Sequence, residues 1–197
     1  MGSDKALLTL AGRTLLERAI ASLAGVVDDL TIVGDREAYH RFGVPVIADA
    51  FPGAGALGGI ATALQHARHE FALVVACDMP FLSRGLLEAM AGQPRDYDAL
   101  VPVTIEAQSS KAGRRIYETL HAIYGRGCLA PLERRIADGE LKVVTALAGV
   151  KVRELSEEWL RNYDPQLQSF VNTNRPEEWA AALARIRGET STVEVRE

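Results

Sequence analysis

The stretch Phe71–Phe81 constrains the fold more than any other part of the chain. Seven small or apolar residues, Phe71–Cys77, end at one acid, Asp78. A short apolar run bounded by turn signals predicts a strand buried on both faces, as in a parallel sheet. Ligands bind beyond the carboxyl ends of such strands, so Asp78 is placed to hold a divalent cation against a phosphate. Alternatively, Asp78 only caps a helix that begins near Ser83, although Ser83 is itself an adequate cap.

Composition narrows the class of protein. The chain has 197 residues, 48% of them hydrophobic, and a formal net charge of -4. These values are typical of a globular domain and argue against a nucleic-acid surface, which is usually basic. Cys77 and Cys128 are interpreted as small buried thiols without a disulfide. We recognise no signal peptide and no apolar run of membrane length, so a cytoplasmic protein without a membrane partner is expected.

A second informative stretch is the loop Asp49–Gly59, which is rich in glycine and precedes a predicted helix, Ile60–Ala67. A glycine-rich loop that runs into a helix offers free N–H groups and the positive end of the helix dipole to an anion. Its glycines also let a planar base lie close to the backbone. Surface loops of this composition are common, so the loop alone is weak evidence for a nucleotide site.

Strands alternate with helices along the rest of the chain, which predicts an α/β fold with a doubly wound, mostly parallel sheet. The polar segment 106–114 is predicted to be a flexible loop over the site. We expect one domain over residues 1–187 and a disordered tail over 188–197. The further predicted strands are Leu30–Val33, Val44–Ala48, Tyr97–Val103, Glu118–Tyr124 and Val150–Leu155.

Five motifs follow one another in an order that resembles the molybdenum cofactor guanylyltransferases, the MobA-like nucleotidyltransferases. The resemblance covers nearly the whole chain and implies a Rossmann-like three-layer α/β/α fold. The motifs are Met1-Gly-x-Asp-Lys-Ala-Leu-Leu, the Asp49–Gly59 loop, Cys77-Asp-Met-Pro-Phe81, Leu120-His-Ala-x-Tyr124 and Asn172-Thr-Asn-x-Pro-Glu-Glu178.

The resemblance implies that GMP passes from GTP to the molybdopterin cofactor and that pyrophosphate leaves. It implies Mg²⁺ at Asp78 and a catalytic cation at Lys5, which also binds nucleotide; both suit a displacement that depends on charge neutralisation and positioning. Molybdoenzyme apoproteins or their chaperones are further partners that the family implies. The remaining implied contacts are Asp49, Gly55, Leu57 and Gly58 for the nucleotide, and Asn172 and Asn174 for the pterin or the metal-bound phosphates.

Simpler interpretations stand beside these roles. Lys5 is otherwise a solvated lysine, Asp49 a loop cap, and Asn172 and Asn174 an Asx turn before the last helix. Two other functions also remain open: a related transferase that uses CTP to make the cytosine dinucleotide cofactor, and a non-catalytic nucleotide-binding module.

Several basic side chains are weaker candidates. His121 is expected to be a packed core histidine, and His66 with His69 lacks a third zinc ligand nearby in sequence. Three arginines, Arg114, Arg115 and Arg126, are candidates for pterin phosphate contacts, with solvent exposure as the simpler expectation.

The chain departs from the family pattern at two places. It has Gly55-Ala56-Leu57 where the family usually has Gly-Pro-Leu. The family also begins with a central strand and a glycine-rich loop, whereas this sequence starts at the methionine that follows that loop. Losing a central strand removes roughly 1.5–3 kcal/mol for each buried aliphatic side chain. We therefore expect that Met1 is internal to a longer natural protein, and that a chain beginning there would be poorly folded or inactive.

Overall fold

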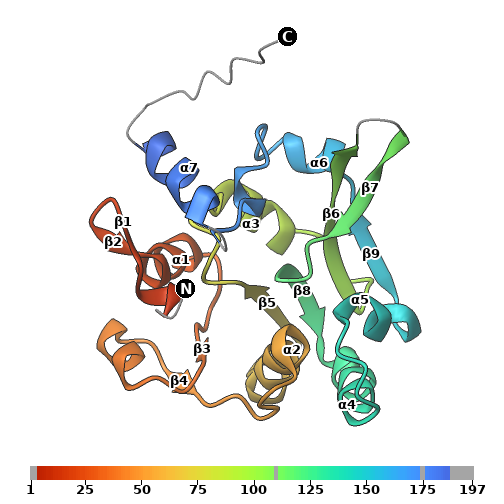
Figure 1. Ribbon diagram of the computed structural model, residues 1–197. Helices are drawn as coiled ribbons and strands as arrows, with labels where there is room; N and C mark the ends of the chain where they lie inside the picture. Colours follow the sequence, from red (N-terminus) through yellow and green to blue (C-terminus); the bar gives the residue numbers. More distant parts are fainter. Residues whose placement is uncertain (1–3, 109–110, 174–175, 187–197) are drawn as a thin grey trace.

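A computed structural model describes residues 4–108, 111–173 and 176–186 (Figure 1). The described strands are β1 Thr9–Leu10, β2 Arg13–Thr14, β3 Ile32–Val33, β4 Val46–Ile47, β5 Phe71–Val75, β6 Ala99–Gln108, β7 Lys111–Tyr117, β8 His121–Gly125 and β9 Val152–Leu155. The α-helices are α1 Leu15–Leu23, α2 Gly55–His66, α3 Arg84–Ala91, α4 Leu129–Ala137, α5 Val143–Ala146, α6 Glu157–Arg161 and α7 Pro176–Ile186. The 3-10 helices are Lys5–Leu7, Glu37–Phe42, Arg126–Cys128, Leu147–Gly149 and Gln168–Phe170.

The main sheet has five strands and is covered by helices on both faces. β8 runs antiparallel between β5 and β6, while β9 pairs in parallel with β6, so β5, β6 and β9 point the same way. Along β8, Ala122 and Tyr124 face the core beneath α2, α4 and α5, whereas Ile123 faces the core beneath α3 and α6. This alternation is the period of a strand that is buried on both sides, and it confirms the predicted α/β class.

Capping residues in the sequence correctly predict where several helices begin. Thr14 and Glu17 form the predicted capping box at the start of α1, because each side chain bonds the backbone of the other. Ser83 caps α3 by accepting a hydrogen bond from the Leu86 amide. The alternative in which Asp78 caps this helix is therefore wrong. Pro176 begins α7, as its fixed φ favours.

The sheet layer is divided between β3 and β5. β3 pairs in parallel with β4, and β5 pairs with β8; within the described residues no pairing joins β3 to β5. All five residues of β5 are only partly buried, whereas all five of β8 are buried. β5 is nevertheless covered on both faces, as predicted, because Ala72 and Val74 pack against the cluster beneath α2, α4 and α5 while Leu73 packs on the other side. Its residues are only partly buried, since among the described residues no strand pairs with its second edge.

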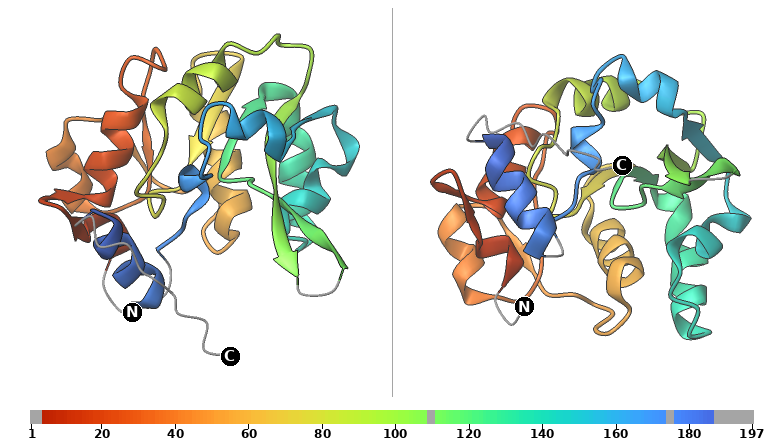
Figure 2. Two further views of the ribbon diagram at one scale, coloured as in Figure 1. Left: turned by 90° about the horizontal axis from the view of Figure 1, so that it is seen from above. Right: turned by 45° about the horizontal axis from the view of Figure 1, so that its top comes forward.

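The segment 106–114 is predicted to be a loop, and for its described residues, 106–108 and 111–114, this is wrong. β6 continues through Gln108 and pairs antiparallel with β7, with Glu106 opposite Arg114. Figure 2 shows this hairpin extending away from the helices. Polar composition suggested a loop because an exposed hairpin needs no apolar period when both strands supply each other's backbone hydrogen bonds.

The last helix returns to the beginning of the chain. α7 packs through Trp179, Ala182 and Leu183 against Leu10 and Leu15, which places it beside β1, β2 and α1 (Figures 1 and 2). The predicted tail 188–197 lies outside the described residues. Among the described helices, none combines the length and apolar character needed to cross a membrane.

Candidate active site

A pocket of about 200 Å³ lies at the tip of β5, where Asp78 follows the strand. Three segments meet there, and two of its polar residues, Asp78 and Asn172, are those predicted from the sequence. The full lining is Ala76, Asp78, Met79, Tyr117, Glu118, Thr119, Leu120 and Asn172.

Asp78 and Asn172 are brought together by Thr173, which is fully buried. Both the backbone N–H and the hydroxyl of Thr173 donate to the backbone carbonyl of Asp78, at 3.1 and 3.0 Å. This double hydrogen bond joins positions 95 residues apart. It fixes the backbone that carries the acid and leaves the Asp78 carboxylate available to the pocket. Asn174, the second predicted asparagine, lies outside the described residues.

Lys5 lies on the same side of the molecule as Asp78. Burial first, and then the charges of Asp78 and Asp4, raise the pKa of Cys77 to about 11, while the ammonium of Lys5 acts in the opposite direction. All three charged groups are therefore close enough to act on one thiol at the end of β5. Asp4 caps the 3-10 helix of Lys5 by accepting from the Ala6 amide at 3.1 Å.

Asp4 is also held from the side by Tyr39, whose hydroxyl lies 3.0 and 2.9 Å from the two carboxylate oxygens. Burial, and then this hydrogen bond, raise the pKa of Tyr39 well above its usual value. The phenol is consequently neutral and donates to the Asp4 carboxylate. The pair anchors the segment that presents Lys5.

The glycine-rich loop has its own hydrogen-bond network. Asp49 Oδ1 accepts from the Phe51 amide and from the Thr62 hydroxyl, both at 2.9 Å, and Thr62 accepts from the Ala50 amide at 3.0 Å. This network supports the loop-cap interpretation of Asp49. It leaves Oδ2 of Asp49 outside these bonds, so the predicted guanine contact stays a prediction.

The start of α2 suits an anion or a base. Gly55 has a φ of +58°, a left-handed conformation that glycine adopts without strain, and Ala54 supplies no side-chain cap. A Cβ on Gly58 would lie 2.8 Å from the Phe51 carbonyl, so this position requires glycine for packing. Leu57 is fully buried in the core, so its predicted nucleotide contact stays a prediction.

Glu118 is a pocket residue that the sequence did not single out. Its carboxylate accepts from the Thr104 hydroxyl at 2.7 Å, and burial raises its pKa. The antiparallel direction of β8 could have identified Glu118 as a site residue. An antiparallel strand begins where its neighbours end, and the residues just before β8, Glu118 and Thr119, therefore lie beside Asp78.

The pocket fits a magnesium ion that arrives with phosphates. No group of three or more His, Cys, Asp or Glu side chains in the described part of the chain is arranged to hold a metal. Mg²⁺ keeps several waters and is usually bound by one or two carboxylates plus substrate oxygens, so Asp78 alone is an adequate protein ligand. His66 and His69 have protein partners: His66 bonds the Thr62 carbonyl at 2.9 Å and His69 bonds Asp29 at 3.1 Å.

The three candidate arginines have protein partners. Arg114 pairs with Glu106 and Arg115 with Glu154, whereas Arg126 donates to the carbonyls of Ala67 and His69. Their predicted phosphate contacts stay predictions.

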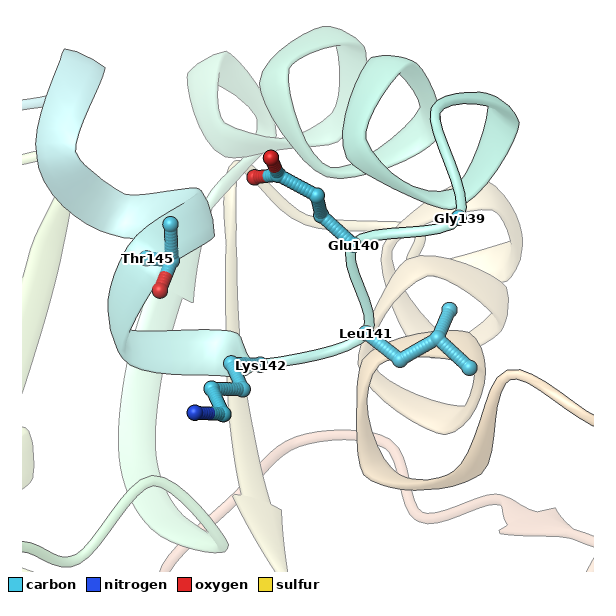
Figure 3. A pocket seen from close by; sticks show the side chains of 5 residues that line it. All are labelled: Gly139, Glu140, Leu141, Lys142 and Thr145. Carbon is cyan, nitrogen blue, oxygen red and sulfur yellow. The ribbon is translucent and has the colours of Figure 1, made fainter.

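A second pocket, of about 350 Å³, lies at the connection between α4 and α5 and contains none of the predicted site residues (Figure 3). Its lining is Gly139, Glu140, Leu141, Lys142 and Thr145.

Comparison with known proteins decides the family. Residues 1–158 match the model of the MobA-like NTP transferase domain. The chain belongs to the MobA-like NTP transferase family. A molybdenum cofactor guanylyltransferase from Desulfosudis oleivorans is 35% identical over 188 residues, covering 94% of this chain and 89% of that protein. The family assignment confirms the resemblance drawn from the five motifs.

Solved structures agree. The crystal structure of molybdopterin-guanine dinucleotide biosynthesis protein A from Archaeoglobus fulgidus has a TM-score of 0.79 and 28% identity, and covers 95% of this chain and 92% of that one. A 2-C-methyl-D-erythritol 4-phosphate cytidylyltransferase from Thermus thermophilus has a TM-score of 0.66 at 21% identity, with 93% and 94% covered. The second likeness concerns the fold alone. Together they confirm the nucleotidyltransferase α/β fold of this MobA-like chain.

Proposed function

We propose that this MobA-like protein transfers GMP from GTP to the molybdopterin cofactor and releases pyrophosphate. The observation that carries the proposal is the single pocket in which Asp78 and Asn172 meet, with Thr173 fixing the backbone of the acid. An oxygen of the acceptor phosphate forms a bond to the α-phosphorus of GTP. The bond from that phosphorus to the bridging oxygen breaks, and its electron pair leaves with pyrophosphate.

The residues of the chain position the substrates and neutralise the charge of their phosphates, and they form no covalent intermediate. Asp78 would hold Mg²⁺, which when bound supplies Lewis-acid stabilisation of phosphate charge. Lys5 places a compact positive charge near the same strand end, where it offsets charge on the phosphates. Asn172 offers an amide that donates to phosphate oxygens or to the acceptor. In this assignment Asp49 and the start of α2 hold guanine, because a carboxylate accepts the N–H groups on the N1/N2 edge of that base.

Asp78→Asn tests the metal role. The amide keeps the shape of the side chain but loses its charge, so pyrophosphate release from GTP with Mg²⁺ and the acceptor present is expected to fall at least about 100-fold. Asp138→Asn, the same change at an exposed position after α4, is the matched control. Unchanged turnover in Asp78→Asn would refute the metal role. Release from CTP at the rate seen with GTP would favour the cytosine alternative, and GTP binding without any release would favour the non-catalytic module.

A further inference from the structure

His121, the first residue of β8, is a buried polar side chain that the proposed chemistry does not use. Its side chain is completely buried, and neither ring nitrogen has a hydrogen-bond partner among the described residues. Burial lowers its pKa to about 4, so the ring is neutral at physiological pH. A neutral imidazole always carries one N–H, which here makes no well-formed hydrogen bond, although the backbone of Ser169 lies near enough to act on it. Such an orphaned group costs stability and requires an explanation.

Three of the groups near the His121 ring, at Asp164, Ser169 and Phe170, belong to one segment, Asp164–Thr173. The ring of Phe170 lies with its centroid 4.9 Å from that of His121. The carboxylate of Asp164, which is buried, and the backbone at Ser169 both act on the imidazole in the direction that favours its proton. An acceptor for the unused N–H is thus at hand in this segment.

The same segment reaches the active-site pocket through Asn172. Ser169 is bound at both ends: its amide donates to Asp164 at 2.7 Å, and its hydroxyl accepts from the Ser83 amide at 2.9 Å. Three residues later the chain reaches Asn172 in the pocket, and Thr173 then bonds the Asp78 carbonyl. Ser169 and Asn172 are therefore three residues apart on one stretch of backbone that is held at both ends by hydrogen bonds.

His121 also adjoins another part of the pocket lining. Its backbone amide donates to the Glu118 carbonyl at 3.0 Å, and residues 118–120 all line the pocket. His121 thus contacts both residue 118, which lines one part of the pocket, and the segment that leads to Asn172.

We propose that His121 is a positioning residue: when substrate fills the pocket, its ring N–H donates to the Asp164–Ser169 region and sets the position of Asn172. The proposal rests on the proposed function, because it assigns Asn172 to the bound substrate. It explains why a polar ring is kept at a place where an apolar side chain would satisfy packing better.

The test compares His121→Phe with His121→Asn and His121→Gln. Phenylalanine keeps a planar ring but removes the N–H, whereas the two amides each restore an N–H at a different reach. We expect His121→Phe to unfold at the same or a higher temperature than the parent protein and to release pyrophosphate about tenfold more slowly, the effect of one lost hydrogen bond. At least one amide variant should recover most of the rate. Met90→Leu, a conservative change in the fully buried core, is the control and should leave the rate unchanged.

Hydrogen exchange at the Thr173 amide supplies a readout that does not depend on turnover. This amide donates to the Asp78 carbonyl, so GTP and Mg²⁺ should slow its exchange in the parent protein and in the rescued amide variant, and much less in His121→Phe. If the parent protein binds nucleotide and shows this protection, His121→Phe shows much less, and neither releases pyrophosphate, the proposed function fails while the role of His121 stands. Parent-like rate and protection in His121→Phe would overturn the proposal, as would a loss of stability that accompanies the loss of rate, because His121 would then be a packing residue.

Discussion

At the residue scale, the site depends on two kinds of side chain. Some line the pocket, and others form hydrogen bonds that fix the backbone around it. Asp78 and Asn172 were recognisable from their motifs. Thr173 was not singled out, because its role depends on the Asp78 carbonyl, which is 95 residues away in the sequence. Thr62 was missed for the same reason, since a buried threonine inside α2 has no sequence signal for the loop that it holds. Sequence patterns indicate local chemistry, whereas these supports exist only after the chain folds.

Thr62 gives the prediction at this scale. Thr62→Val keeps the shape of the side chain but removes the hydroxyl that donates to Asp49 and accepts from the Ala50 amide. Thr62 is fully buried, but Asp49 is only partly buried and Ala50 is exposed, so water compensates in part and the free energy of unfolding should fall by about 1 kcal/mol. The loop of Asp49 should loosen as well, and the KM for GTP should rise about tenfold.

Thr62→Ser is the matched control, because serine restores the hydroxyl and should keep the KM for GTP near that of the parent protein. Urea unfolding and steady-state pyrophosphate release separate the two effects. If the valine variant lost stability but kept its KM, Asp49 would be a loop cap without a role in binding guanine.

At the scale of elements, helices were predicted better than strands. Caps such as Thr14 with Glu17 and Ser83 are local, so the sequence determined them. The β6–β7 hairpin was taken for a loop because its pairing is a property of two strands and not of either one. The partial burial of β5 could not be predicted from its sequence either, because burial depends on which strand lies alongside.

Among the described residues no strand pairing joins β3 to β5, but helices cover both strands. α2 packs against both strands, and α1 contributes Leu16 to the cluster of Ile32 and Leu23 to the cluster of Val75. The helical layers therefore continue across a sheet layer that does not. An edge of apolar residues with unpaired backbone groups invites association with other strands.

We predict that a strand supplied in front of Met1 stabilises residues 1–197. A segment of Val, Ile and Leu joined through a glycine-rich linker could pair with the open edges of β3 and β5 and bury the exposed parts of β5. Each aliphatic side chain that becomes buried contributes roughly 1.5–3 kcal/mol, so the urea midpoint should rise and binding of the dye ANS should fall. A Gly/Ser segment of equal length should change neither. Equal midpoints for the two fusions would show that the division does not accept a strand.

At the scale of the whole molecule, the two helical layers bury several titratable groups whose pKa values shift in different directions. Burial lowers the pKa of His121, raises that of Glu118, and raises those of Cys77 and Cys128 to about 11. Of these groups, His121 has the largest effect on stability at acid pH, because it is completely buried and its pKa shift is large. Glu118 acts in the opposite sense: its raised pKa means that the folded state holds this proton more readily than the unfolded state.

His121 therefore predicts an acid-sensitive fold. The unfolded chain takes up a proton on this residue near pH 6.5, whereas the folded protein takes it up near pH 4. Stability from a neutral His121 is thus fully present above pH 6.5 and is lost as the pH falls through 6.5 toward about 4. The upper bound is roughly 3–4 kcal/mol, at about 1.4 kcal/mol per pH unit, and Glu118 offsets part of it.

Urea unfolding between pH 7 and pH 4 measures this loss, and His121→Phe is the informative comparison because it removes the titrating ring while Asp164 and Glu118 remain. The parent protein should lose stability over this range, and the variant should lose markedly less, so the two curves should diverge as the pH falls. Curves that stay parallel would mean that the acid sensitivity arises elsewhere, for example from surface carboxylates such as Glu154 and Glu157, whose pKa values are lowered in the folded state. In that case the buried imidazole would not be the group that couples protonation to folding.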